Sequence, residues 1–209
     1  MKILTLDFEG SLKTGIREIG VLYVVSEKMT SYQDMVIQNK EECIKALGSI
    51  VENKPDLFIS HNVHIEKNLL KSYLPYNRKC SNAISLEWGP WIDTTIIYRT
   101  LYPNIATYDL GFLTKTFIKK RVEELSSIIC SPDKKFHHNA LYDAICTYLL
   151  FERIQKKVNV NKTRLGIIKI LNMMNAKIKL QNKKLYKGEE VADIYVKNNN
   201  NFKSINCPS

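Results

Sequence analysis

Long apolar runs and ordered cysteine patterns are both missing from this sequence of 209 residues. No stretch approaches the roughly 18–20 consecutive apolar residues of a membrane-spanning helix, so we expect no membrane partner. The amino-terminal segment reaches Asp7 and Glu9 too early for the apolar core of a signal peptide. Five scattered cysteines without a CxxC pair favour reduced thiols in a cytoplasmic protein over a disulfide framework or a zinc knuckle.

The composition supplies enough apolar material for a folded domain. Hydrophobic residues make up 44% of the chain and charged residues 25%. This balance is typical of a globular protein and excludes a disordered or fibrous one. One domain of about 150–200 residues with an appendage accounts for the length.

Positive charge is concentrated in the last quarter of the chain. Residues 155–209 hold 12 Lys and Arg against 3 Asp and Glu, whereas residues 1–154 hold 19 against 18. A basic segment attracts phosphate chains or acidic protein surfaces. We therefore expect a nearly neutral domain over residues 1–155 and a basic, partly helical extension over residues 156–209 that contacts nucleic acid or a partner protein. A solvated, lysine-rich helix face is the alternative.

Hydrophobic periodicity predicts a run of strands followed by strands and helices in alternation. The first three strands, joined by short polar turns, favour an antiparallel meander. This order is typical of an α/β or α+β domain with a mixed sheet. The expected elements are strands at 3–9, 16–25 and 32–38, a helix at 40–53, a strand at 56–60, helices at 63–74, 93–101 (capped by Asp93-Thr94), 109–120 and 139–155, loops at 76–91 and 126–135, and, in the extension, a helix at 164–181 before a disordered end from Asn198.

Acidic side chains recur at the ends of expected strands and the starts of expected helices. Asp7 and Glu9, two residues apart on a strand, point to the same face. Two such carboxylates repel each other and resist burial, and a divalent cation between them removes both costs. Glu66 lies on the first turns of one helix, and Asp143 borders the apolar face of a later one. A carboxylate facing a core is costly without a partner.

Together these four acids and His138 predict a metal centre. Two divalent ions about 3.5–4 Å apart, held by carboxylates, are a common device for phosphodiester hydrolysis. Hard oxygen ligands select Mg²⁺ or Mn²⁺ over zinc. His138, five residues before Asp143, would supply a general base with a pKa near working pH. Each motif alone also fits an ordinary solvated strand end or helix start.

The order of these motifs resembles a known family. Leu6-Asp7-Phe8-Glu9, His61-Asn62-x-x-Ile65-Glu66 and His138-x-Ala140-x-x-Asp143-Ala144 are similar to the three motifs of the DEDDh family of 3′–5′ exonucleases. Further likenesses are Glu18-Ile19-Gly20, Ile92-Asp93-Thr94 and Tyr108-x-Leu110-x-x-Leu113. The resemblance covers about residues 1–155 and implies an α/β fold of the ribonuclease H-like type, a mixed five-stranded sheet flanked by helices.

The resemblance also implies a role for each site residue. Asp7, Glu9 and Asp143 would hold the ion nearer the nucleophile, and Asp7 would bridge to the second ion. Glu66 would serve that second ion, and His138 would orient and deprotonate the attacking water. The implied cofactors are two ions of Mg²⁺ or Mn²⁺.

For the substrate, the resemblance implies a nucleic-acid 3′ end. The backbone around Phe8 and Gly10 would receive the 3′-hydroxyl and sugar of the terminal nucleotide, and Asn62 would hold the segment beside the site. Nucleoside monophosphates would leave one at a time from a single-stranded or overhanging 3′ end. Proofreading and repair relatives favour DNA over RNA, and trimming within a larger assembly, including CRISPR spacer precursors, fits the basic extension.

Glu66 departs from the family pattern, which usually has Asp at this position. We expect activity to survive the extra methylene, because the second ion is often held through water in this family. Weaker activity or a preference for Mn²⁺ stays open. The alternative function is a catalytically weak, exonuclease-like module that binds nucleic acid or a partner protein.

Histidines and tryptophans allow two other interpretations. A zinc site from His61, His64, His137 and His138 is disfavoured, because adjacent histidines on an extended segment point opposite ways. His137 is then expected at the surface or facing the substrate. Trp88 and Trp91 could stack on bases, but each also fits a loop anchor that packs on the core.

Overall fold

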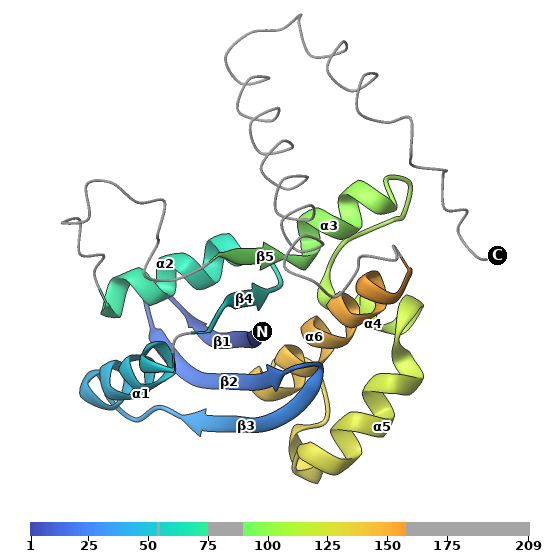
Figure 1. Ribbon diagram of the computed structural model, residues 1–209. Helices are drawn as coiled ribbons and strands as arrows, with labels where there is room; N and C mark the ends of the chain where they lie inside the picture. The colour runs from blue at the N-terminus through green and yellow to red at the C-terminus, as the bar shows by residue number, and fades with distance from the viewer. Residues whose placement is uncertain (54, 75–89, 158–209) are drawn as a thin grey trace, which may run out of the picture.

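The computed structural model describes residues 1–53, 55–74 and 90–157. It confirms the predicted α/β architecture, because one mixed five-stranded sheet lies between two groups of helices (Figure 1). The strand order across the sheet is β3-β2-β1-β4-β5. The strands are β1 (Lys2–Ser11), β2 (Gly15–Val25), β3 (Lys28–Val36), β4 (Leu57–Ser60) and β5 (Trp91–Asp93).

The central strand β1 is much longer than its neighbour β4. β1, β2 and β3 form the predicted antiparallel meander, and β4 and β5 add to it in parallel. β4 pairs only with Ile3, Leu4 and Thr5 of β1. From Leu6 onward β1 therefore has an edge without a strand partner among the described residues, and this edge becomes important for the candidate site.

Helices cover both faces of the sheet and bury two separate apolar clusters. α1 and α2 pack on Leu4, Leu6 and Phe8 of β1, whereas α3 to α6 pack on the other face. Because side chains alternate along a strand, Asp7 and Glu9 belong to the face covered by α6. The helices are α1 (Lys40–Glu52), α2 (Val63–Tyr73), α3 (Thr94–Leu101), α4 (Leu110–Phe117), α5 (Lys119–Ile129) and α6 (Ala140–Lys157), with a short 3₁₀ turn η1 (Pro132–Lys134).

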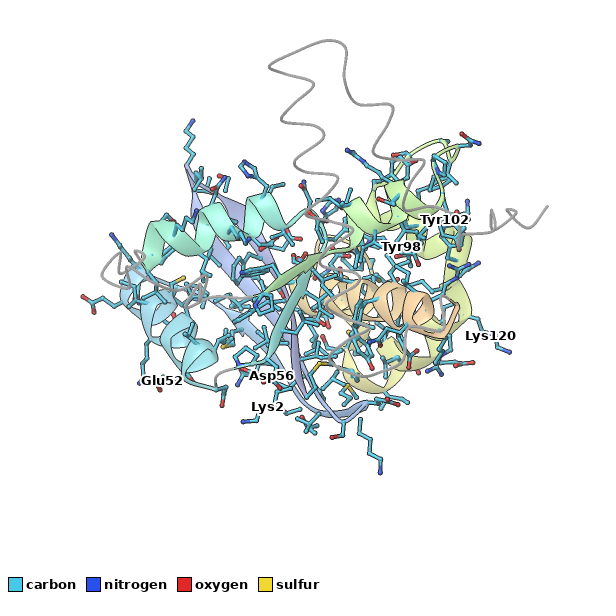
Figure 2. All side chains as sticks on the ribbon, turned by 45° about the horizontal axis from the view of Figure 1, so that its top comes forward. Lys2, Glu52, Asp56, Tyr98, Tyr102 and Lys120 are labelled. Atoms are coloured by element: carbon cyan, nitrogen blue, oxygen red, sulfur yellow. The ribbon has the colours of Figure 1, made fainter. Side chains whose placement is uncertain are left out.

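Polar contacts fasten the ends of these elements. Tyr98 donates to the Leu150 carbonyl at 3.2 Å and Tyr102 accepts from Arg153 at 2.8 Å, which ties α3 to α6 (Figure 2). At the start of β1, the Lys2 backbone N–H donates to Asp56 at 2.7 Å. The first two contacts lie within one helix layer and the third lies at the start of the sheet strands, away from the predicted metal centre.

Two sequence predictions around α4 and α5 were wrong. The single helix expected at 109–120 is two helices, separated at Ile118, whose φ of −141° is not helical. The loop expected at 126–135 begins within α5, which continues to Ile129. Val122, Ser126 and Ile129 form its buried stripe. A serine in this stripe weakened the apolar pattern, and the Ile118 side chain is buried in the core at the point where the chain bends.

The end of the loop predicted at 76–91 was also wrong, because Trp91 begins β5. Its ring stacks on Phe58 with the ring centroids 4.8 Å apart, and only 5% of Trp91 is exposed. Of the two interpretations, Trp91 is therefore a core anchor. Trp88, the helix predicted at 164–181 and the predicted disordered end lie outside the described residues. Among the helices described, none combines the length and apolar content that a bilayer crossing requires.

Candidate metal centre

The first part of the site is the carboxyl-terminal half of β1. Asp7 and Glu9 are both half-buried on the face that α6 covers. Their cross-strand partners on β2 are Gly20 and Glu18 respectively. Both carboxylates thus project from a rigid, centrally placed strand.

Gly20 allows α6 to reach these acids. A Cβ atom on Gly20 would overlap the backbone of Ala140 and Leu141, in the first turn of α6. Only glycine therefore permits the helix start to lie directly on β2 at this point. Because Gly20 is the register partner of Asp7, the same contact brings the start of α6, with Asp143, to Asp7.

Asp143 is held by the two histidines that precede α6. Only 6% of Asp143 is exposed. Its Oδ1 accepts a hydrogen bond from His137 Nδ1, and its Oδ2 accepts one from the His138 backbone N–H at 2.9 Å. His137, expected at the surface or facing the substrate, has a half-buried ring that is bound to Asp143 and packs edge-on against Tyr142.

His138 adopts a strained backbone and an exposed side chain. Its φ is 69°, in the left-handed region, and Asn62 at the start of α2 has a φ of 64°. Such conformations cost about 1–3 kcal/mol and persist where surrounding structure enforces them, often at functional sites. Donor atoms of Glu9, His138 and Asp143 lie within 4.8 Å of one another. The strained turn thus leaves the His138 ring accessible beside two of the acids.

Asp93 positions the start of α2. As predicted, its side chain caps α3, and it accepts from Thr95 N–H at 2.9 Å. It also accepts from the N–H groups of Asn62 and Val63 at 3.2 and 3.0 Å. The backbone of Asn62 is therefore fixed, whereas its side chain makes no capping hydrogen bond.

Glu66 reaches the open edge of β1 from the first turn of α2. The Phe8 backbone N–H donates to the Glu66 carboxylate. β4 leaves this N–H free, because its pairing with β1 ends at Thr5. Only 4% of Glu66 is exposed, and its Oε2 is buried without a hydrogen-bond partner among the described residues. A buried carboxylate oxygen with no partner is costly unless a cation or a donor reaches it.

Phe8 and Gly10 lie on either side of Glu9. The Phe8 ring is buried in the cluster under α1 and α2, so only its backbone lies at the site. Gly10, at a φ of 153°, follows a register shift in the β1–β2 pairing, and a Cβ there would overlap the Gly15 carbonyl. The chain therefore passes close to itself beside Glu9, with no side chain in the way.

The four acids form one cluster, here called the acidic cluster: Asp7, Glu9, Glu66 and Asp143. Burial raises the pKa of Asp7 well above its usual value, and the charges of Glu66 and Asp143 raise it further. Burial and the charge of Glu9 likewise raise the pKa of Glu66. Burial also raises the pKa of Glu9, and the charge of Asp143 adds to this.

The donor set of this cluster fits hard divalent ions. Within the described part of the chain, no lysine or arginine forms an ion pair with any of its carboxylates. The unpartnered Glu66 oxygen and the mutual repulsion of the acids would both be relieved by cations with oxygen ligands. The structure thus brings together all four predicted acids and His138, which the sequence places up to 136 residues apart.

The four histidines do not form a zinc site. His61 Nδ1 pairs with Thr94 Oγ1 at 2.8 Å and its Nε2 donates to the Tyr108 carbonyl at 2.9 Å, so both ring nitrogens are occupied. His64 pairs with Asn68 at 3.0 Å. The two metal-capable groups found within the described residues are Glu9, His138, Asp143 and His137, Asp143, Cys146. Neither contains His61 or His64.

Comparison with solved structures identifies the fold. The match to a structure described as Exonuclease X in complex with 5′ overhanging duplex DNA covers 80% of this chain and 98% of the exonuclease chain, with a TM-score of 0.52 and 20% sequence identity. The chain shares the fold of this exonuclease. Exonuclease I from Methylocaldum szegediense covers 82% of this chain and 45% of that chain, with a TM-score of 0.44 and 14% identity.

Sequence comparisons add only short local matches. No known protein family matches the chain. Two curated 3-phosphoshikimate 1-carboxyvinyltransferases match over short segments. The Syntrophomonas wolfei enzyme is 51% identical over 45 residues and the Crocosphaera subtropica enzyme 48% identical over 46, about 22% of this chain. The chain spans about a tenth of the length of these relatives. A match of this extent does not assign a family.

Proposed function

We propose that this chain is a metal-dependent 3′–5′ exonuclease of the DEDDh type, which hydrolyses phosphodiester bonds and releases nucleoside monophosphates. One observation carries the proposal. Four carboxylates from β1, α2 and α6 lie close enough to raise one another's pKa, and none of them forms an ion pair with a lysine or arginine among the described residues. Such a cluster is unstable by itself and suits a centre that binds cations.

Asp7, Glu9 and Asp143 would hold one Mg²⁺ or Mn²⁺ ion, and Asp7 with Glu66 would hold a second. When bound, the two ions would supply activation of the attacking water and stabilisation of the charge on the leaving oxygen. The Phe8 backbone N–H orients the Glu66 carboxylate and leaves its Oε2 free for this role. This arrangement supports Glu66 as a replacement for the usual Asp.

The two histidines would have different tasks. His138, with its exposed ring beside Glu9 and Asp143, would accept the proton of the attacking water as general base. The ring of His137 is already bound to Asp143 and would keep that carboxylate oriented. The proton acceptor is therefore assigned to His138.

The substrate in this proposal is a single-stranded or overhanging 3′ end, with DNA favoured over RNA. The backbone near Phe8 and Gly10, on either side of Glu9 in β1, would receive the terminal 3′-hydroxyl and sugar. Asn62, whose side chain makes no capping hydrogen bond, would line the same site. The DNA held by Exonuclease X supports a nucleic-acid substrate for a chain of the same fold.

A digestion assay tests the proposal. End-labelled single-stranded DNA, single-stranded RNA and duplexes with 3′ overhangs are incubated with Mg²⁺ or Mn²⁺. Wild type should release monophosphates from the 3′ end, whereas Asp7→Ala should not. Glu66→Asp should match or exceed wild type. If wild type is as inert as Asp7→Ala, the enzyme proposal is wrong.

A catalytically weak binding module is the second candidate, and Glu66 is the residue that favours it. Thermal unfolding separates the two functions. An exonuclease should be stabilised by Mg²⁺ or Mn²⁺ together with a nucleoside monophosphate, because a ligand that binds only the folded state raises Tm. A module without a metal centre should show no such shift.

The basic extension, residues 156–209, would hold the nucleic-acid chain or a partner protein beside the domain in the cytoplasm. Replacing Lys183, Lys184 and Lys187 by glutamine tests whether the extension binds nucleic acid. For each lysine that binds a phosphate, its replacement should reduce the slope of log K against log salt by about 0.7 for a single strand. An unchanged slope would argue against binding through these lysines.

A further inference from the structure

On the face covered by α6, the sheet carries two acids, Glu18 and Asp34, that do not belong to the acidic cluster. Across the strands, Asp7 pairs with Gly20 and Gly20 with Asp34, while Glu9 pairs with Glu18. Cross-strand partners share a face, so these four acids lie on the same side of the sheet around Gly20. We call this set, Asp7, Glu9, Glu18 and Asp34, the acidic face.

Lys134 forms ion pairs with both acids in one half of the acidic face, Glu18 and Asp34. Its Nζ lies 2.7 Å from Glu18 Oε1 and 3.0 Å from Asp34 Oδ2. The exposed fractions of the three side chains are 24%, 14% and 26%, so this is a half-buried network and not a surface pair. Such partly desolvated, charge-assisted hydrogen bonds are stronger and more geometrically fixed than exposed ion pairs.

The position of Lys134 in the chain connects this network to the proposed general base. Lys134 ends the 3₁₀ turn η1, four residues before His138. The segment between them is bound at its far end, where Asp143 accepts from His137 and from the His138 backbone, and Asn139 donates to the Phe136 carbonyl at 3.0 Å. Lys134 is the corresponding anchor at its near end.

Two anchors explain how the strained backbone of His138 is maintained. A histidine in the left-handed region persists where the surrounding structure enforces that conformation. Asp143 fixes the chain after the turn, and the pairs with Glu18 and Asp34 fix it before the turn. The anchoring residues on β2 and β3 lie 116 and 100 positions from Lys134 in the sequence.

We propose that Lys134 is a positioning residue, which holds the turn carrying His138 against β2 and β3 so that the His138 ring lies beside Glu9 and Asp143. Lys134 acts through His138 and does not touch the substrate. The inference deepens the proposed function and rests on it.

Kinetics with three variants test the inference. Lys134→Met should lower kcat on single-stranded DNA by about 10–100-fold, as small misplacements of catalytic groups do, with KM within about twofold. Lys134→Arg, which keeps the charge, should recover most of the activity. Lys119→Met is the matched control, because Lys119 forms an exposed pair with Glu123 at 3.9 Å, and it should match wild type.

A double-mutant cycle separates positioning from a general structural role. In a His138→Ala background, adding Lys134→Met should cause little further loss, because the group it positions is gone. An equal loss in both backgrounds would overturn the inference, as would an unchanged kcat in Lys134→Met with wild type active.

Amide hydrogen exchange gives a readout that needs no activity. In metal-free, full-length protein, Lys134→Met should speed exchange of residues 135–139 at least tenfold, whereas Lys119→Met should not. Unchanged exchange in this segment would overturn the inference even if wild type proved inert on every nucleic acid. Inert wild type with faster exchange would instead contradict the proposed function alone and leave the anchoring role supported.

Discussion

Two neighbouring groups of acids on one sheet are treated in opposite ways. Glu18 and Asp34 share the ammonium of Lys134, whereas Asp7, Glu9, Glu66 and Asp143 form no ion pair with a lysine or arginine among the described residues. Burial by itself would lower the pKa of Lys134, but its hydrogen bonds to Glu18 and Asp34 raise it instead.

The difference is that the chain itself supplies a cation to Glu18 and Asp34 but supplies no lysine or arginine, among the described residues, to the acidic cluster. A second lysine beside the acidic cluster would reduce its charge in the way that Lys134 does for Glu18 and Asp34. Leaving the acidic cluster unneutralised costs stability, because its members repel one another at close range. Such a cost is typical of sites that bind ions for function.

The largest expected effect follows from removing one carboxylate of the acidic cluster. Asp7→Ala or Asp143→Ala should lower exonuclease activity by at least about 10³-fold, because ion-mediated charge stabilisation contributes several kcal/mol to the barrier. Glu41→Ala, an exposed acid on α1, is the control and should retain activity. Initial rates on labelled DNA measure the effect, and activity in Asp7→Ala close to that of Glu41→Ala would refute the assignment.

Replacing each histidine separately tests the different roles proposed for His137 and His138 beside the acidic cluster. His138→Ala should lower kcat by about 10²-fold or more, as loss of a general base does, with metal affinity unchanged. His137→Ala should chiefly weaken metal binding, because Asp143 loses the hydrogen bond that orients it. Mn²⁺ titrations by calorimetry and kcat measurements distinguish them. The reverse pattern would exchange the two roles.

Gly20 is the residue around which both acid groups are arranged. Gly20→Ala should lower the free energy of unfolding by about 1–3 kcal/mol, since the added methyl overlaps the backbone of α6. Gly48→Ala in α1 meets open space and should raise it by about 0.5–1 kcal/mol. Urea unfolding measures both. Equal effects would contradict the close approach of α6 to β2.

The pH dependence of stability tests the burial and mutual repulsion of the acids on this face, including Glu18, whose pKa burial also raises. The pKa values of Asp7, Glu9 and Glu66 are raised in the folded state, so the folded protein holds protons that the unfolded chain releases. Stability of metal-free protein should therefore fall as pH rises above the ordinary values of 3.8 and 4.5.

A neutral substitution and added metal should both counter this loss. At neutral pH, Asp7→Asn or added Mn²⁺ should raise Tm by about 2–4 °C, which corresponds to about 1 kcal/mol. Calorimetry at several pH values, with chelator or Mn²⁺, measures the effect. An Asp7→Asn variant with the same metal-free Tm as wild type at every pH would show that the acids do not repel one another as described.

Much of the fold followed from local pattern. The antiparallel strands, the helix of Asp143 and the cap at Asp93 were confirmed because each depends on residues close in sequence. Predictions that rested on short or interrupted patterns were wrong. β5 has three residues, too few for a periodic signal, and the buried Ser126 hid the apolar stripe of α5.

By itself, the sequence determined the strand and helix periods and the chemical identity of the acids, because these depend on neighbours a few residues away. Only the tertiary structure decided which of these groups meet. Gly20 allows the start of α6 to lie on β2, and His137 binds Asp143. Lys134 pairs with Glu18 on β2 and Asp34 on β3, which lie 116 and 100 residues earlier in the sequence. Sheet register and helix packing set such long-range contacts, and no local pattern encodes them.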